Sequence, residues 1–149
     1  NRIIADSVTT YSTEVGWQWK SYLLLSEWFS QTVTSIESAV QSNAQYDGYY
    51  LQFSGLLGAK SRNYKNGRFT RVKGISHIGT LEWVIRYSEL DAFDNNTGTI
   101  AENITVGLNY IYSKRWKFMT NYVMSNIERP ATGFTQEGNA ISMRVHFRF

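Results

Sequence analysis

The sequence predicts an all-β fold, a transmembrane antiparallel β-barrel, and three observations support this prediction. Apolar and polar residues alternate along several stretches, as they do where one face of a strand meets lipid and the other meets water. Short turns and longer polar segments separate these stretches in alternation, like the periplasmic turns and external loops of bacterial outer-membrane barrels. The last stretch ends on an apolar, aromatic residue, Phe149, which resembles the terminal signal of these barrels.

The composition fits a membrane barrel and also a soluble β protein. The 149 residues include one Pro and no Cys, 42% of them are hydrophobic, 15% are aromatic, and the net charge is +3. Only alternate residues of a barrel strand face lipid, so the negative mean hydropathy does not exclude a membrane protein. No run approaches the ~18 apolar residues of a transmembrane helix. The chain starts at Asn1 without a basic and apolar leader, so we expect a processed chain or a fragment.

The first two strands are expected over residues 7–19 and 22–33, with a tight turn at 20–21. The first strand has an apolar face that includes Tyr11, Val15, Trp17 and Trp19. The second strand is less regular, because two apolar residues share the face of Glu27. A polar loop is expected over residues 34–46.

The stretch from Gly79 to Leu90 gives the clearest strand. Its apolar face has Leu81, Trp83, Ile85 and Tyr87, and its polar face has Glu82, Val84, Arg86 and Ser88. A third strand, from Tyr49 to about Ala59, precedes it and alternates in the same way. In a soluble sandwich the apolar face would lie in the core, so the alternation of one strand does not distinguish a sandwich from a barrel.

The rest of the chain repeats the pattern. The expected elements are a loop at 91–102, a strand at 104–112, a turn at 113–115, a strand from Trp116 to Met124, a loop at 127–137 and a last strand at 139–149. In the last strand, apolar residues from Ile141 to Phe149 alternate with Ser142, Arg144, His146 and Arg148. One long connection, about 61–77, lies on the side of the short turns, and we expect it to fold inward.

This reading gives seven strands and no separate domains. Bacterial barrels have an even number of strands, and a water-filled porin needs about 16 to 18. We therefore expect the carboxy-terminal part of a larger barrel, of about 16 strands. The alternative is a closed barrel with a filled interior, whose eighth strand would lie in residues 1–6 or 68–77.

Two neighbouring motifs resemble those of a known family. The residues Gly79, Glu82, Arg86, Tyr87, Leu90 and Asp91 follow the pattern G-x-W-E-x-x-x-R-Y-x-x-L-D, with Leu81 in place of Trp. Upstream, residues 47–50 and then Arg62, Tyr64, Gly67 and Phe69 are similar to G-Y-Y, G-E-x-R-x-Y and G-x-F, with Ala59 and Lys60 in place of Gly and Glu. The chain resembles the phosphate-selective porin O and P family in these motifs.

The resemblance implies an outer-membrane porin through which anions diffuse passively, without enzymatic chemistry or a cofactor. Its implied partners are phosphate or another inorganic anion, outer-membrane lipid and lipopolysaccharide, and the barrel-assembly machinery, which would bind the Phe149 terminus. It also implies a homotrimer in the bacterial outer membrane, and it gives no reason to expect nucleic acid. Phosphate, polyphosphate and chloride would be attracted by the same charges.

Positive charge gathers on the connection before the strand from Gly79 to Leu90. Between Asp47 and Glu82 there is no acidic residue, while six cations occur there. Arg offers a planar fork that suits phosphate oxygens, and Lys offers a mobile charge, so both can replace the lost hydration of an anion. With two further arginines on the polar faces of strands, the candidates for the anion pathway are Lys60, Arg62, Lys65, Arg68, Arg71, Lys73, Arg86 and Arg144.

Other readings of these charges stay open. The basic connection can be a solvated loop that contacts anionic lipid, and Arg86 and Arg144 can pair with Glu82 or Glu27 across strands. A rival function is a small filled barrel or an adhesion module whose basic stretch contacts lipopolysaccharide or another polyanion. No metal site is expected, because His77 and His146 are isolated and the acidic loop after Leu90 lacks calcium-loop spacing.

Overall fold

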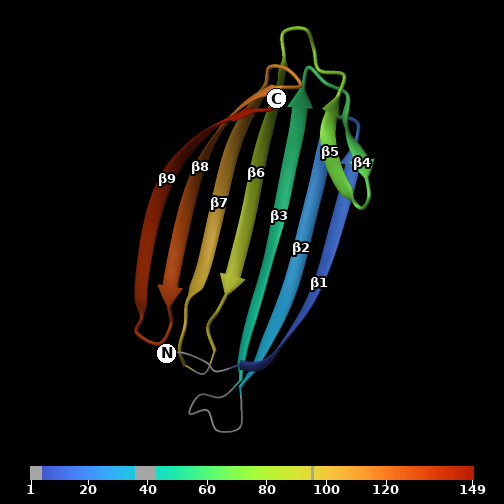
Figure 1. Ribbon diagram of the computed structural model, residues 1–149. Helices are drawn as coiled ribbons and strands as arrows, with labels where there is room; N and C mark the ends of the chain where they lie inside the picture. Colours follow the sequence, from blue (N-terminus) through green and yellow to red (C-terminus); the bar gives the residue numbers. More distant parts are fainter. Residues whose placement is uncertain (1–4, 36–42, 95) are drawn as a thin grey trace.

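The computed structural model describes residues 5–35, 43–94 and 96–149, and they form one antiparallel sheet of seven strands with a separate two-stranded hairpin (Figure 1). The order in the sheet is β1-β2-β3-β6-β7-β8-β9, and β4 pairs with β5. The strands are β1 (Ala5–Trp19), β2 (Tyr22–Ser35), β3 (Ala44–Leu57), β4 (Ser61–Lys65), β5 (Arg68–Lys73), β6 (Thr80–Asp91), β7 (Ile100–Ile111), β8 (Trp116–Arg129) and β9 (Phe134–Phe147). The prediction of an all-β antiparallel fold is confirmed.

Two loops of the structure are shorter than the sequence pattern predicts. The prediction of a loop at 127–137 is wrong, because β8 and β9 pair as far as Arg129 and Phe134 and leave only a tight turn. The guanidinium of Arg129 lies 5.5 Å from the ring centroid of Phe134, which closes this end of the hairpin. The expected loop at 34–46 also loses residues to β2 and β3, and residues 36–42 lie outside the described part of the chain.

The basic connection contains regular structure that the sequence reading did not identify. Its residues form β4 and β5, which turn at Asn66 and Gly67 with positive φ angles of 51° and 75°. Within the described residues β5 pairs with β4 and not with the sheet, so 68–77 does not supply the eighth barrel strand of the alternative reading. The other proposed source of that strand was residues 1–6, of which residues 5 and 6 belong to β1 and residues 1–4 lie outside the described residues.

Side chains alternate between two faces of the sheet, which we name the Glu82 face and the Trp83 face after neighbouring residues of β6. The register places members of one face side by side from strand to strand, as in the row formed by Leu24, Phe53, Ile85, Val106, Tyr122 and Ile141 on the Trp83 face. Most of this row is exposed, including Ile85 at 50% and Ile141 at 69%. An apolar face that remains exposed over seven strands is suited to lipid and not to water.

The buried core of the described residues is correspondingly small. Its buried hydrophobic side chains are Leu23, Ala44, Leu56 and Ile111. A soluble sandwich of this size would bury its apolar faces against one another. Among the described residues, no helix is long and apolar enough to cross a bilayer.

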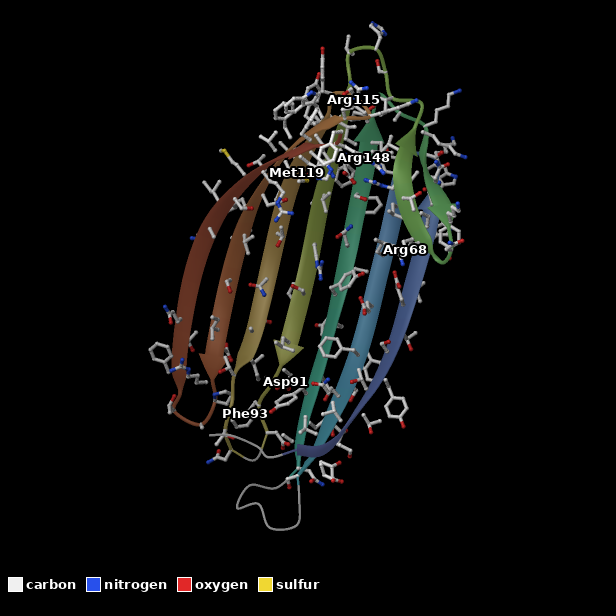
Figure 2. The ribbon with its side chains drawn as sticks, viewed as in Figure 1. Arg68, Asp91, Phe93, Arg115, Met119 and Arg148 are labelled. Atoms are coloured by element: carbon white, nitrogen blue, oxygen red, sulfur yellow. The ribbon has the colours of Figure 1, made fainter. Side chains whose placement is uncertain are left out.

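The two ends of the sheet differ. Figure 1 shows the hairpin β4–β5 beside β1 and β2, at the end of the sheet where the carboxy terminus lies. The short turns at Lys20 and Ser113 belong to this end, which we call the turn end. Asp91 and Phe93 lie at the opposite end, the loop end, in Figure 2.

Candidate functional site

A buried carboxylate on β6 is the centre of the Glu82 face. Glu82 is 5% exposed, and it forms an ion pair with Arg62 of the hairpin. Its Oε2 accepts a hydrogen bond of 2.9 Å from Nδ2 of Asn109 on β7, and it lies 3.9 Å from Nζ of Lys117 on β8. Two cations and one amide therefore surround a single carboxylate, which leaves a net positive charge at this point.

The register explains how these groups meet. Asn109 stands directly opposite Glu82 across the β6–β7 pair, and Lys117 stands opposite Ile111 on the next pair. Side chains one strand away and on the diagonal are within reach of one another in a sheet. Burial lowers the pKa of the Arg62 guanidinium from its ordinary value, and the group is still a cation at neutral pH.

The hairpin also contacts β1. The backbone N–H of Arg62 donates a hydrogen bond of 3.2 Å to Oε1 of Gln18. The ring of Phe69 fills the space above Gly16, where an added Cβ would lie 2.8 Å from Cε2 of Phe69 and 3.2 Å from Cδ2 of Leu25. Gly16 thus provides the room in which the hairpin packs on the Glu82 face.

A cavity of about 580 Å³ opens between the hairpin and the sheet. Its charged lining residues are three cations, Arg62, Arg86 and Lys117, and one carboxylate, Glu82. The other lining residues include polar side chains of β3, β7, β8 and β9, namely Gln52, Asn103, Thr105, Asn121 and Ser142. Donors that line a partly enclosed space can replace the hydration of a small anion.

A second cavity, of about 1030 Å³, lies at the turn end between the hairpin and the turn after β7. Its lining has no Asp or Glu, and its basic members are Arg62, Lys73, His77, Lys114, Arg115, Lys117, His146 and Arg148. Figure 2 shows Arg115 and Arg148 at this end, where the backbone N–H of Arg148 donates a 2.9 Å hydrogen bond to the carbonyl of Arg115. Arg62 and Lys117 line both cavities, so the two cavities are neighbours at these residues.

The arginine of the central strand has a different partner from Arg62. Arg86 lies over the ring of Tyr50, with Cζ 3.9 Å from the ring centroid. Two carboxylates, Glu14 and Glu27, face each other directly across β1 and β2 on the same face of the sheet. Glu82 forms its ion pairs with Arg62 and Lys117 and not with Arg86, which was one of its expected partners.

The remaining candidates spread over the hairpin and the sheet edge. Lys60 is exposed just before β4, Lys65 and Arg68 are exposed on either side of the hairpin turn, and Lys73 is exposed at the end of β5. Figure 2 shows Arg68 at the turn. Arg71 belongs to β5, and Arg144 is exposed on the edge strand β9, opposite Met119. Their part in an anion pathway stays a prediction.

The sequence reading missed Lys117 and Asn109. Both stand at alternate positions between apolar residues, so the period of two already assigns them to the polar face. Their meeting with Glu82 depends on the pairing of three strands, which the spacing along one strand does not reveal. Within the described ranges, no group of three or more acidic, His or Cys residues is arranged to hold a metal ion.

Comparison with known proteins agrees with this geometry. No curated protein sequence gives a significant match. The sequence profile of the family described as phosphate-selective porin O and P matches residues 4–149. A porin is an outer-membrane β-barrel channel and not an enzyme, and its strands have a lipid-facing and a water-facing side, as those of this sheet do. Because the profile spans nearly the whole chain, the protein belongs to the phosphate-selective porin O and P family.

Proposed function

We propose that the protein allows anions such as phosphate or polyphosphate to diffuse passively across the bacterial outer membrane along the Glu82 face. The single observation that supports this most directly is the charge of the residues that line the two neighbouring cavities. Cations outnumber carboxylates around the cavity under the hairpin, and no carboxylate lines the cavity at the turn end. Such a lining raises the local concentration of anions and repels cations.

The two ends of the sheet give the path an orientation in the membrane. We place the loop end outside the cell and the turn end in the periplasm, as short turns are periplasmic in outer-membrane barrels. An anion would pass the cavity beside Arg86 and Lys117 and leave through the basic cavity at the turn end. Conduction needs several sites of moderate affinity, because one deep site would trap the ion.

The eight residues predicted from the sequence enter this proposal with different weights. Arg62 and Arg86 line the cavity under the hairpin, and Lys73 lines the cavity at the turn end. Lys117 joins them in both cavities. The other candidates, Lys60, Lys65, Arg68, Arg71 and Arg144, would attract anions toward the path by their longer-range field.

The test is the reversal potential of the native full-length protein in a planar lipid bilayer under a salt gradient, repeated with added phosphate. We expect an anion-selective current that phosphate reduces, because phosphate binds guanidinium and ammonium groups more strongly than chloride does. A cation-selective current, or none, would contradict the proposal. It would leave the basic hairpin as a surface that contacts anionic lipid or another polyanion.

The partners implied by the family belong to the same proposal. We propose a homotrimer whose barrels contact one another and lipopolysaccharide through the Trp83 face, and recognition of the Phe149 terminus by the barrel-assembly machinery. Chemical crosslinking in isolated outer membranes tests the first point, since it should give a trimeric band and no larger ladder. Deleting Phe149 should lower the amount of protein assembled in the membrane.

A further inference from the structure

The hairpin β4–β5 is held on the Glu82 face by contacts to distant strands. The side chain of Arg62 forms an ion pair with Glu82 on β6. The backbone N–H of Arg62 donates a 3.2 Å hydrogen bond to Gln18 on β1. Phe69 packs above Gly16 on β1. The hairpin therefore lies across the face on which we place the anion path, and its position determines how much of that path is open.

Among these contacts, the one to Glu82 is the most costly to break. The carboxylate is 5% exposed, and the sheet itself offers it one amide at 2.9 Å and one ammonium at 3.9 Å. A buried carboxylate that loses a close ionic partner leaves a charge with little compensation. Arg62 is the partner that comes from the hairpin. If the hairpin leaves the face, Glu82 must therefore become exposed to water or remain buried without its closest cation.

The other contacts do not have this property. Gln18 lies close to the turn end of β1, and water can replace its amide as the partner of a backbone N–H. Phe69 is partly exposed, so only part of its apolar surface is removed from water by the contact with β1. Neither contact leaves a buried charge when it opens.

We infer that Glu82 is the positioning residue of the pathway: it holds the β4–β5 hairpin on the sheet, fixes Arg62 in the lining and thereby sets the width of the anion path. Glu82 touches Arg62, Asn109 and Lys117 and acts on the passing ion through them. Its own negative charge neutralises one of two neighbouring cations, and it leaves the other to attract anions. The inference rests on the proposed function only where it concerns ion flow.

The test separates anchoring from conduction. Hydrogen exchange of the native full-length protein in micelles reports local opening of the hairpin amides, residues 61–73, against those of β8 as an internal reference. In Glu82→Gln we expect exchange of the hairpin amides to rise on the order of ten- to a hundredfold, the usual range for a charge-assisted hydrogen bond. The amides of β8 should be unchanged.

The matched control is Glu27→Gln, which removes the same charge from the same face. Glu27 lies on β2 and stands opposite Glu14 and Tyr50, so its loss should not change exchange in the hairpin. The double variant Arg62→Gln/Glu82→Gln should open the hairpin no more than Glu82→Gln alone, because both changes remove one interaction. Additive effects, or unchanged exchange in Glu82→Gln, would overturn the inference.

Two further readouts keep the inference decidable. If Glu82→Gln does not fold, Arg62→Gln tests the same contact from the hairpin, and unchanged exchange there would also overturn the inference. In a bilayer, we expect Glu82→Gln to raise single-channel conductance, and faster exchange with unchanged conductance would refute the claim about width. If the unaltered protein conducts no ions, the proposed function fails, whereas the exchange result still decides whether Glu82 anchors the hairpin.

Discussion

Replacing Gly55 by Ala should destabilise the protein, because the ring of Trp83 occupies the space above this glycine. The two residues stand directly opposite each other on β3 and β6. A Cβ on Gly55 would lie 2.7 Å from three atoms of the indole ring, while ordinary contact begins at 3.4 Å. The ring must therefore move by about 0.7 Å, the difference between these two distances.

The ring has little freedom to move without losing contacts. It forms edge contacts with Phe53 and Tyr22, with centroid separations of 5.2 and 6.4 Å. Such aromatic pairs contribute about 0.5–1.5 kcal/mol each, and overpacking by one carbon costs about 1–3 kcal/mol. We expect Gly55→Ala to lower the free energy of unfolding by about 1–3 kcal/mol. Aromatic circular dichroism should weaken as the cluster loosens.

The assay is denaturant unfolding of the protein folded in micelles, followed by tryptophan emission. Gly138→Ala is the control, because no atom lies within 4 Å of its added Cβ. That variant should stay within about 0.5 kcal/mol of the unaltered protein. In a Trp83→Leu background, the penalty of Gly55→Ala should largely disappear. Equal stability of Gly55→Ala and Gly138→Ala would refute the argument that the ring needs the glycine.

Two further predictions concern the anion path, and a third concerns the packing of the hairpin. Arg86→Gln should reduce anion selectivity in reversal-potential measurements without unfolding the protein, since the cation lies over Tyr50 at the cavity wall; an unchanged potential would place it outside the path. Lys117→Gln should weaken phosphate block of the current, because Lys117 lines both cavities; full block would contradict its role. Phe69→Ala should speed hydrogen exchange in the hairpin by on the order of tenfold, and Gly16→Ala should do so only while the Phe69 ring is present.

Side-chain alternation predicted the faces of the sheet well. Trp83 and Ile85 were expected on the apolar face of their strand, and in the sheet they stand opposite the apolar residues Leu108 and Val106 of β7. This succeeds because a strand bounded by lipid and water has to keep a period of two. The signal is local, so one strand is enough to read it.

Strand ends were predicted less well. The loop expected at 127–137 is mostly polar, and β8 and β9 nevertheless pair through it, as in Glu128 with Thr135. Ladder hydrogen bonds join backbone groups, so they continue where the side chains of both faces are polar. The hairpin β4–β5 was missed for a related reason, since its short strands are rich in cations and their alternation is weak.

Along the sequence the six cations of the basic connection are equivalent candidates, and the fold gives them different surroundings. Arg62 is held by a buried carboxylate, whereas Lys65 and Arg68 are exposed at the hairpin turn. A paired guanidinium contributes less to the field in the path than its formal charge indicates, because Glu82 cancels most of it at a distance. Lys117, outside the basic connection, lies near the same carboxylate and restores a net positive charge there. The selectivity of the path should therefore follow from the strands that converge on Glu82, and substitutions at the hairpin turn should change it less than a substitution on β8.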